Sequence, residues 1–275
     1  MSAITGLTST LVQGVSSVQA EIAKVQNELA TGVKTMNPAQ QGIVTRLASQ
    51  VSIYSADATN ITQATSVINV GQTSLSTLSS IISQMQQLAT QAASGGLSTT
   101  DLTSLNTTFT ALASQISAAI QNATVNGTNL LYNSPTGTYG VTTNGSITVQ
   151  IGLDTTGTAS IAGQALDTTL AMLVTGLSIS TQAGANSAIT SLASGLTSVS
   201  TAQSNLNAFS TAMGADLASV TSLGSNLTAT INSLQAVDQT AAQAELQQLN
   251  NQQSVDYYLV SQMNTEAAAI LTLFR

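Results

Sequence analysis

Apolar residues recur every three or four positions along most of the chain, which is the spacing of one face of an α-helix. In the first half, the pattern predicts helices over about 7–29, 41–93 and 102–120. In the second half, it predicts a helix over about 189–234 and another from about 244 to the last residue. The alternating steps of three and four residues in the second half are typical of a coiled-coil seam.

Turn residues separate these helical runs. Gly32 is expected to end the first helix, and Asn37-Pro38 separates it from the second. A hydroxyl residue among 98–100 can cap the third helix, with Asp101 in its first turn at the positive end of the helix dipole. The NGTN stretch at 126–129 then ends the helical periodicity.

Between about 132 and 185 the pattern changes to that of short strands. Asn144-Gly145 lies between β-branched runs and is a strong signal for a hairpin turn. Apolar and polar residues alternate over 147–151, which predicts a strand with one buried face. A second turn is expected around 154–160.

The sequence therefore predicts a mainly α fold, with long antiparallel coiled-coil helices from both chain halves and a small β-hairpin insertion. The subunit is expected to be rod-shaped, because a helix over 41–93 is roughly 80 Å long at ~1.5 Å per residue. The predicted domains are 1–40 with 240–275 as a terminal coiled coil, 41–131 with 186–239 as a helical rod, and 132–185 as the insertion.

Charge is scarce in this sequence. Charged residues make up 5% of the chain, against roughly 25% in average proteins, while 43% hydrophobic residues are enough for a sizeable core. The 4 lysines and arginines are not clustered and face 11 acidic residues, so nucleic acid is excluded as a partner. No apolar run reaches the ~18–20 residues of a membrane span, so no membrane insertion is expected.

Histidine, cysteine and tryptophan are absent. Nucleophile pairs of the Ser-His or Cys-His kind are therefore impossible, and no glycine-rich phosphate-binding loop occurs. We expect no enzyme activity, no catalytic residue, no cofactor and no metal site. The first residues also lack the basic segment of a cleavable signal peptide, so an exported form is expected to use another route.

Six short stretches match, in order, motifs of one family. They are ELATGVKT (28–35), QQLATQAASG (86–95), LSTTDL (97–102), ATVNGTNLL (123–131), the stretch 206–217 and the ending ILTLFR (270–275). With these motifs, the chain resembles bacterial flagellin over nearly its whole length. The short insertion indicates a form without large outer domains.

The resemblance implies a structural subunit that polymerises into the extracellular filament of the bacterial flagellum and serves motility. It also implies as partners other copies of the chain, the flagellar export apparatus, an export chaperone, and hook-associated and cap proteins. Two alternatives stay open. The chain could be a hook–filament junction protein, or a secreted coiled-coil binding or tip protein of a different class.

The apolar stripes of the terminal helices need partners, and the resemblance implies that they pack in the subunit assembly. The predicted assembly residues are Leu7, Leu11, Val18, Ile22, Leu246, Leu249, Tyr257, Leu259, Met263, Ile270, Leu271 and Phe274. The resemblance further implies a surface that a Toll-like receptor recognises, here at Gln84, Gln86 and Leu88. Because Gln84 and Gln86 replace arginines of the family, we expect this surface to be altered.

Overall fold

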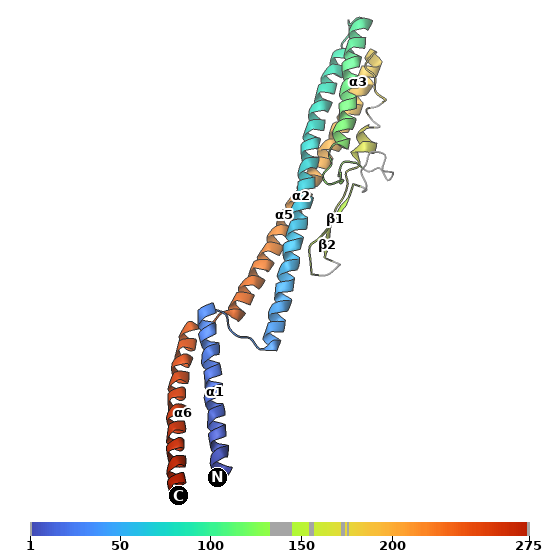
Figure 1. The fold of residues 1–275 in the computed structure, drawn as a ribbon. Helices are drawn as coiled ribbons and strands as arrows, with labels where there is room; N and C mark the ends of the chain where they lie inside the picture. Colours follow the sequence, from blue (N-terminus) through green and yellow to red (C-terminus); the bar gives the residue numbers. More distant parts are fainter. Residues whose placement is uncertain (1, 133–144, 154–156, 172–173, 175, 274–275) are drawn as a thin grey trace. The chain divides into compact units, whose positions relative to one another are not determined.

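The computed structural model describes residues 2–132, 145–153, 157–171, 174 and 176–273. The elements are α1 (Ser2–Thr31), α2 (Pro38–Ala93), α3 (Thr99–Gln121), β1 (Ile147–Gln150), β2 (Thr158–Ile161), the short π-helix η1 (Asp167–Ala171), α5 (Gln182–Gln235) and α6 (Gln239–Leu273). The prediction of a mainly α fold with long helices and a small β-hairpin is confirmed (Figure 1).

Contacts divide the chain into two compact units. The terminal unit contains Met1–Ser49 and Asn226–Arg275, and the central unit contains Gln50–Ser225. Both α2 and α5 contribute residues to the two units.

Side-chain caps fix where α2 and α3 begin. Before α2, the Gln40 N–H donates to Asn37 Oδ1 at 2.8 Å, and the Asn37 N–H donates to Gln40 Oε1 at 3.2 Å. Pro38 is the first helical residue, where its missing N–H costs nothing. Of the three hydroxyl residues that could cap α3, the structure selects Ser98, which forms a reciprocal capping box with Asp101.

Caps also explain why two helices begin earlier than the hydrophobic pattern predicts. The α6 helix begins at Gln239 because the Asp238 carboxylate accepts the N–H groups of Thr240 and Ala241 at 3.0 and 3.1 Å. The α5 helix begins at Gln182, where the Thr181 hydroxyl accepts the Gly184 N–H at 3.1 Å. A cap satisfies the first N–H groups of a helix before its apolar stripe begins.

The two strands form an antiparallel hairpin, with Ile147 opposite Ile161 and Gln150 opposite Thr158. The chain reverses between 150 and 158, near the second turn expected around 154–160. The hairpin turn expected at Asn144-Gly145 stays a prediction. The stretch 133–144, which includes the predicted first arm, lies outside the described residues.

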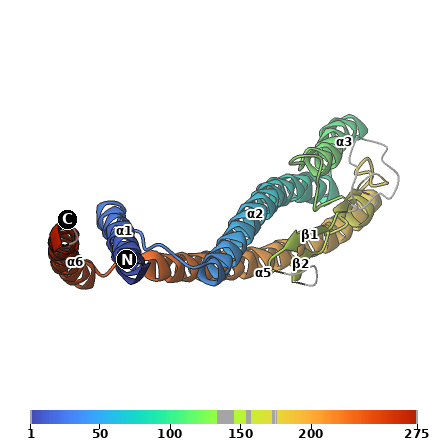
Figure 2. The ribbon, with the colours of Figure 1, turned by 60° about the horizontal axis from the view of Figure 1, so that its bottom comes forward.

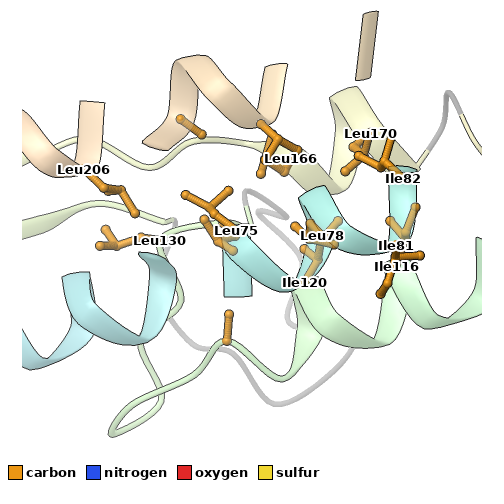
Figure 3. Close-up of a cluster of buried hydrophobic side chains, with 14 of the residues drawn as sticks. Leu75, Leu78, Ile81, Ile82, Ile116, Ile120, Leu130, Leu166, Leu170 and Leu206 are labelled. Carbon is orange, nitrogen blue, oxygen red and sulfur yellow. The ribbon is translucent and has the colours of Figure 1, made fainter. Parts of the chain in front are cut away.

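Large apolar side chains from α2, α3, α5 and the segments around the hairpin fill the core of the central unit. Figure 3 shows Leu78 of α2 beside Ile120 of α3 and Ile81 beside Ile116, while Ile82 lies beside Leu170. The largest fully buried side chains are Phe109, Ile61, Ile68, Leu75, Leu78, Ile82, Met85, Ile116, Ile120, Leu130, Leu131 and Ile161.

Asn129 is a buried polar residue that closes the end of α3. Its Nδ2 donates to the carbonyl oxygens of Ile120 and Gln121 at 2.7 and 3.3 Å, and its Oδ1 accepts the Leu131 N–H at 2.8 Å. It therefore satisfies helix-end carbonyls that lack a partner within the helix. This contact lies within the ATVNGTNLL stretch and gives that motif a structural role.

Serine and threonine hydroxyls along the helices bond mainly to their own backbone. Thr65 donates to the Ile61 carbonyl at 2.8 Å, and Thr90 donates to the Gln86 carbonyl at 2.8 Å. Such bonds to the carbonyl four residues earlier recur along α2, α3 and α5. They let a polar helix surface satisfy its hydroxyl donors without a charged side chain.

Close backbone packing at the base of the hairpin leaves no room for a side chain at Gly163. A Cβ added at Gly163 would collide with the backbone of Gly145, whereas one added at Gly214 within α5 would have nothing within 4 Å. We expect Gly163→Ala to lower the free energy of unfolding by about 1–3 kcal/mol. We expect Gly214→Ala to raise it by about 0.4–1 kcal/mol. Urea unfolding followed by circular dichroism checks both, and changes of the same sign in the two variants would contradict the backbone contact.

Candidate subunit-assembly surface

In the terminal unit, α1 and α6 lie side by side and run antiparallel, as Figures 1 and 2 show. At one end the Lys34 N–H donates to the Gln235 carbonyl at 2.8 Å, and further along Gln19 Nε2 donates to the Tyr257 hydroxyl at 2.6 Å. Positions on α6 therefore rise as positions on α1 fall. These two bonds fix the register of the pair.

The seam between these two helices is apolar but made of modest side chains. Its buried members are Val18, Ile22, Val25, Ala242 and Leu249, with Leu29, Val237 and Leu246 partly buried beside them. Four of the predicted assembly residues, Val18, Ile22, Leu246 and Leu249, thus pack within one chain. Leu11 is also partly buried.

A second apolar surface of α6 faces solvent. Val255, Tyr258 and Leu259 are 57%, 68% and 42% exposed, and their spacing of three and four residues places them on one face of the helix. Tyr257 is 49% exposed. Contiguous exposed apolar side chains of this kind mark interaction sites. We call Val255, Tyr258 and Leu259 the outer face of α6.

Several exposed apolar residues of this unit are not among the predicted assembly residues, and two of them lie on its paired helices. Val12 of α1 is 58% exposed, and Val255 belongs to the outer face of α6. Neither lies on the main stripe of its helix, so periodicity alone passes over both. A search for apolar residues left off the stripe would have found them.

The remaining predicted residues divide between described and undescribed side chains. Met263 is partly buried, Gln84 is exposed, and Gln86 and Leu88 are partly buried on α2. Leu88 packs against the core of the central unit. The side chains of Leu7, Ile270 and Leu271 and all of Phe274 lie outside the described residues.

Glu28 anchors the turn that follows α1. Gly32 ends the helix with φ +69°, as predicted, and Glu28 Oε1 then accepts the Thr35 N–H at 2.8 Å. Burial alone would raise the pKa of Glu28, but the bonds from the Thr35 backbone and hydroxyl and the charges of Lys24 and Lys34 outweigh it, so the pKa lies below its ordinary value. The ELATGVKT stretch thus contains a carboxylate that holds its own turn.

The described residues offer little for catalysis. Two clefts beside the hairpin, of about 350 and 520 Å³, are lined by amide, hydroxyl and apolar side chains. Among the described residues, no group of three or more acidic residues could hold a metal ion. Of the helices described, none is long and apolar enough to cross a membrane.

Residues 5–136 match the family model of the bacterial flagellin N-terminal helical region. Two flagellins of Caulobacter vibrioides, FljO and FljK, are each 26% identical to this chain, over 96% of this chain and 94% of their own length. The chain is therefore similar to bacterial flagellins over nearly its whole length. A crystal structure of Bacillus cereus flagellin matches the fold with a TM-score of 0.51 at 25% identity, covering 63% of this chain and 94% of that one.

The carboxylate of Glu28 can be tested through the amide that it binds. Because the folded pKa lies below the ordinary value of 4.5, its stabilising contribution is present above that value and is lost as the pH falls. At neutral pH we expect Glu28→Gln to speed exchange of the Thr35 amide hydrogen by about tenfold, since bonds to charged groups contribute about 1.5–3 kcal/mol. The difference from the wild type should shrink only as the pH falls below 4.5 and through the lowered folded pKa.

Hydrogen exchange read by NMR checks this expectation, with Glu21→Gln at an exposed position of α1 as the control. Equal effects of the two substitutions, or a Glu28→Gln effect that does not change with pH, would contradict the assigned role.

Proposed function

We propose that the chain is the structural subunit of a bacterial flagellar filament and polymerises outside the cell through its terminal helices. The observation that carries this proposal is the outer face of α6, which stays exposed after α1 and α6 have paired. Similarity to flagellins over 96% of the chain supports this class of assembly. The occupant of the outer face is then another copy of the chain.

The energetics of the terminal unit favour this reading. The α1–α6 seam buries mostly valine, alanine and single leucine or isoleucine side chains, and each contributes about 1.5–3 kcal/mol at most. Two helices with so small a common core gain stability when neighbouring copies cover their outer surfaces. With 5% charged residues, those contacts rest on apolar and amide groups rather than on ion pairs.

The proposed layers follow the sequence. Residues 1–40 with 240–275 form the inner layer, 41–131 with 186–239 form a second helical layer, and 132–185 project as a small insertion. The further partners follow from the family resemblance. A flagellar export apparatus and an export chaperone carry the chain out without a cleavable signal, and hook-associated and cap proteins lie at the ends of the filament.

A catalytic role is not part of this proposal. The chain has no histidine or cysteine, and the two clefts beside the hairpin are lined without a titratable side chain. Its relatives are flagellins, which act as structural proteins.

Assembly can be tested by removing the end of α6 or its outer face. Deleting 262–275 is expected to leave a folded, soluble chain that forms no filaments, because the terminal stripe loses its length. Val255→Ala with Tyr258→Ala is expected to raise the critical concentration for assembly by tenfold or more, at about 1.4 kcal/mol per factor of ten. Gln243→Ala with Asn250→Ala is the control, at exposed positions of the same helix that lie off the outer face.

Electron microscopy and sedimentation measure the result. Long tubes from the wild-type chain and the control support the proposal. Normal filaments from the truncated chain would refute it. Isolated rods from the wild-type chain at high concentration would favour a secreted tip protein, and short non-growing assemblies would favour the hook–filament junction protein.

We also propose that glutamine at 84 and 86 weakens recognition by a Toll-like receptor. Gln84 is exposed on α2, and a glutamine lacks the charge and the bidentate donors of an arginine. Gln84→Arg with Gln86→Arg is expected to raise receptor activation at matched monomer concentration in a cell reporter assay. Thr59→Arg, elsewhere on the exposed surface of α2, is the control for added charge. Equal activation by all three chains would count against this surface.

A further inference from the structure

A carboxylate occupies a core position of the longest helix. Along α2, Tyr54, Asp57, Ile61, Ala64 and Ile68 follow one another in steps of three and four, which places all five on the buried stripe. Asp57 is 2% exposed, as buried as its apolar neighbours. Its Oδ2 atom has no hydrogen-bond partner among the described residues. Buried acidic groups without a partner are rare in folded proteins.

The partner helix offers Asp57 an apolar surface. A Cβ added at Gly224 of α5 would lie 3.8 Å from the Tyr54 Cβ, and Leu206 of α5 lies against Gly71. Positions on α5 therefore fall as positions on α2 rise, and Asp57 faces the part of α5 between these two contacts. Val220, in that part of α5, is itself only 4% exposed.

Neither α2 nor α5 places a cation beside Asp57. The structure describes α2 and α5 throughout, and their only charged residues are Arg46, Asp57 and Asp216. Arg46 is eleven positions before Asp57 on the same helix, about 16 Å along the axis at ~1.5 Å per residue. Asp216, on α5, has the same sign as Asp57 and is partly exposed. Tyr54 is the other titratable group beside it, and neither β1 nor β2 carries a charge.

Little in the described part of the chain satisfies an ionised carboxylate at this position. No counter-charge on α2 or α5 lies beside it, its Oδ2 atom has no donor, and its side chain is almost unexposed. Burial accordingly raises the pKa of Asp57 above the ordinary 3.8. A carboxyl group that carries its proton is neutral and can stay in an apolar seam at much lower cost.

We propose that Asp57 makes the packing of α2 against α5 depend on pH. Ionised at neutral pH, it weakens the seam between the two helices around 54–64, and its protonation on acidification stabilises that seam. This inference does not depend on the filament, because it concerns contacts inside the central unit. The two helices are expected to separate locally and transiently near Asp57 at neutral pH, while the core beyond Ile68 stays closed.

The sign of the pH dependence follows from the direction of the pKa. In the unfolded chain Asp57 titrates near its ordinary value of 3.8, whereas in the seam it holds its proton to higher pH. The stability that this group contributes is therefore fully present below the ordinary value, and it is lost as the pH rises through the raised value. Other acidic residues titrate in the same range, so the informative quantity is the difference between variants at each pH.

Hydrogen exchange of the unassembled full chain, between pH 7.5 and pH 4.5, tests the proposal. We compare the wild type with Asp57→Asn and Asp57→Leu, and use Asp216→Asn as the control for loss of a partly exposed negative charge on the facing helix. At neutral pH, amides around 54–64 are expected to open about tenfold less often in the Asp57 variants, because these no longer hold an unpartnered buried charge in the seam. The Asp57→Asn chain and the wild type should converge at the acidic end.

A constant difference across the pH range would overturn the proposal, since a purely steric role does not titrate. So would a wild type better protected than Asp57→Asn at neutral pH, or an Asp216→Asn effect as large as that of Asp57→Asn. A second measurement uses the wild-type chain alone and does not depend on whether a variant folds. Carbon-13 labelling of the seven aspartates lets NMR follow each carboxyl in the wild-type chain, and a carboxyl of Asp57 that titrates at or below its ordinary value would also overturn it.

Discussion

Each unit of this chain is stabilised by its own core of apolar side chains spaced by three and four residues, since the sequence provides few charged residues for ion pairs. The two units use this interaction to different extents. In the central unit, a third helix and the hairpin segments cover the long seam, and residues such as Leu75, Ile82 and Phe109 are fully buried. In the terminal unit, two helices meet over smaller side chains, and apolar area remains on the outside. Because the terminal unit buries less apolar surface than the central unit, its helices are the ones that gain stability when neighbouring copies cover them.

The long helices could be predicted because their apolar period persists over many turns, and no local signal competes with it. Their ends were less predictable, since a cap acts before the stripe begins, as Asp238 does for α6. The turn between β1 and β2 lies near the one expected around 154–160, whereas the pairing of Ile147 with Ile161 is not visible in the local pattern. Asn129 is recognisable in the sequence only as part of a motif, because its three bonds exist only after the chain has folded back onto α3.

The sequence pattern does not separate residues that pack within one chain from residues that stay exposed. A helical stripe tells which face of a helix is buried but not against what, so Val18 and Leu249 follow the same rule as Leu259 although they pack inside one chain. Val12 and Val255 are exposed and lie off the main stripe of their helices. The role of Glu28 depends on a turn with positive φ at Gly32, which brings the Thr35 amide back to a carboxylate seven positions earlier.

The hydroxyls that return to their own helix determine what the surface can offer a neighbour. A serine or threonine hydroxyl has one donor and two acceptor lone pairs, and in Thr65 and Thr90 the single donor is already spent on the carbonyl four residues earlier. Long stretches of the helical surface therefore offer a neighbour hydroxyl oxygens as acceptors, while the hydroxyl protons are already used within the helix. Side-chain amides can donate to such acceptors, as Gln72 does when its Nε2 donates to Asn207 Oδ1 at 2.7 Å. In a chain with four cations, asparagine and glutamine thus take over the donor role that lysine and arginine have on most protein surfaces, and they do so without attracting counterions.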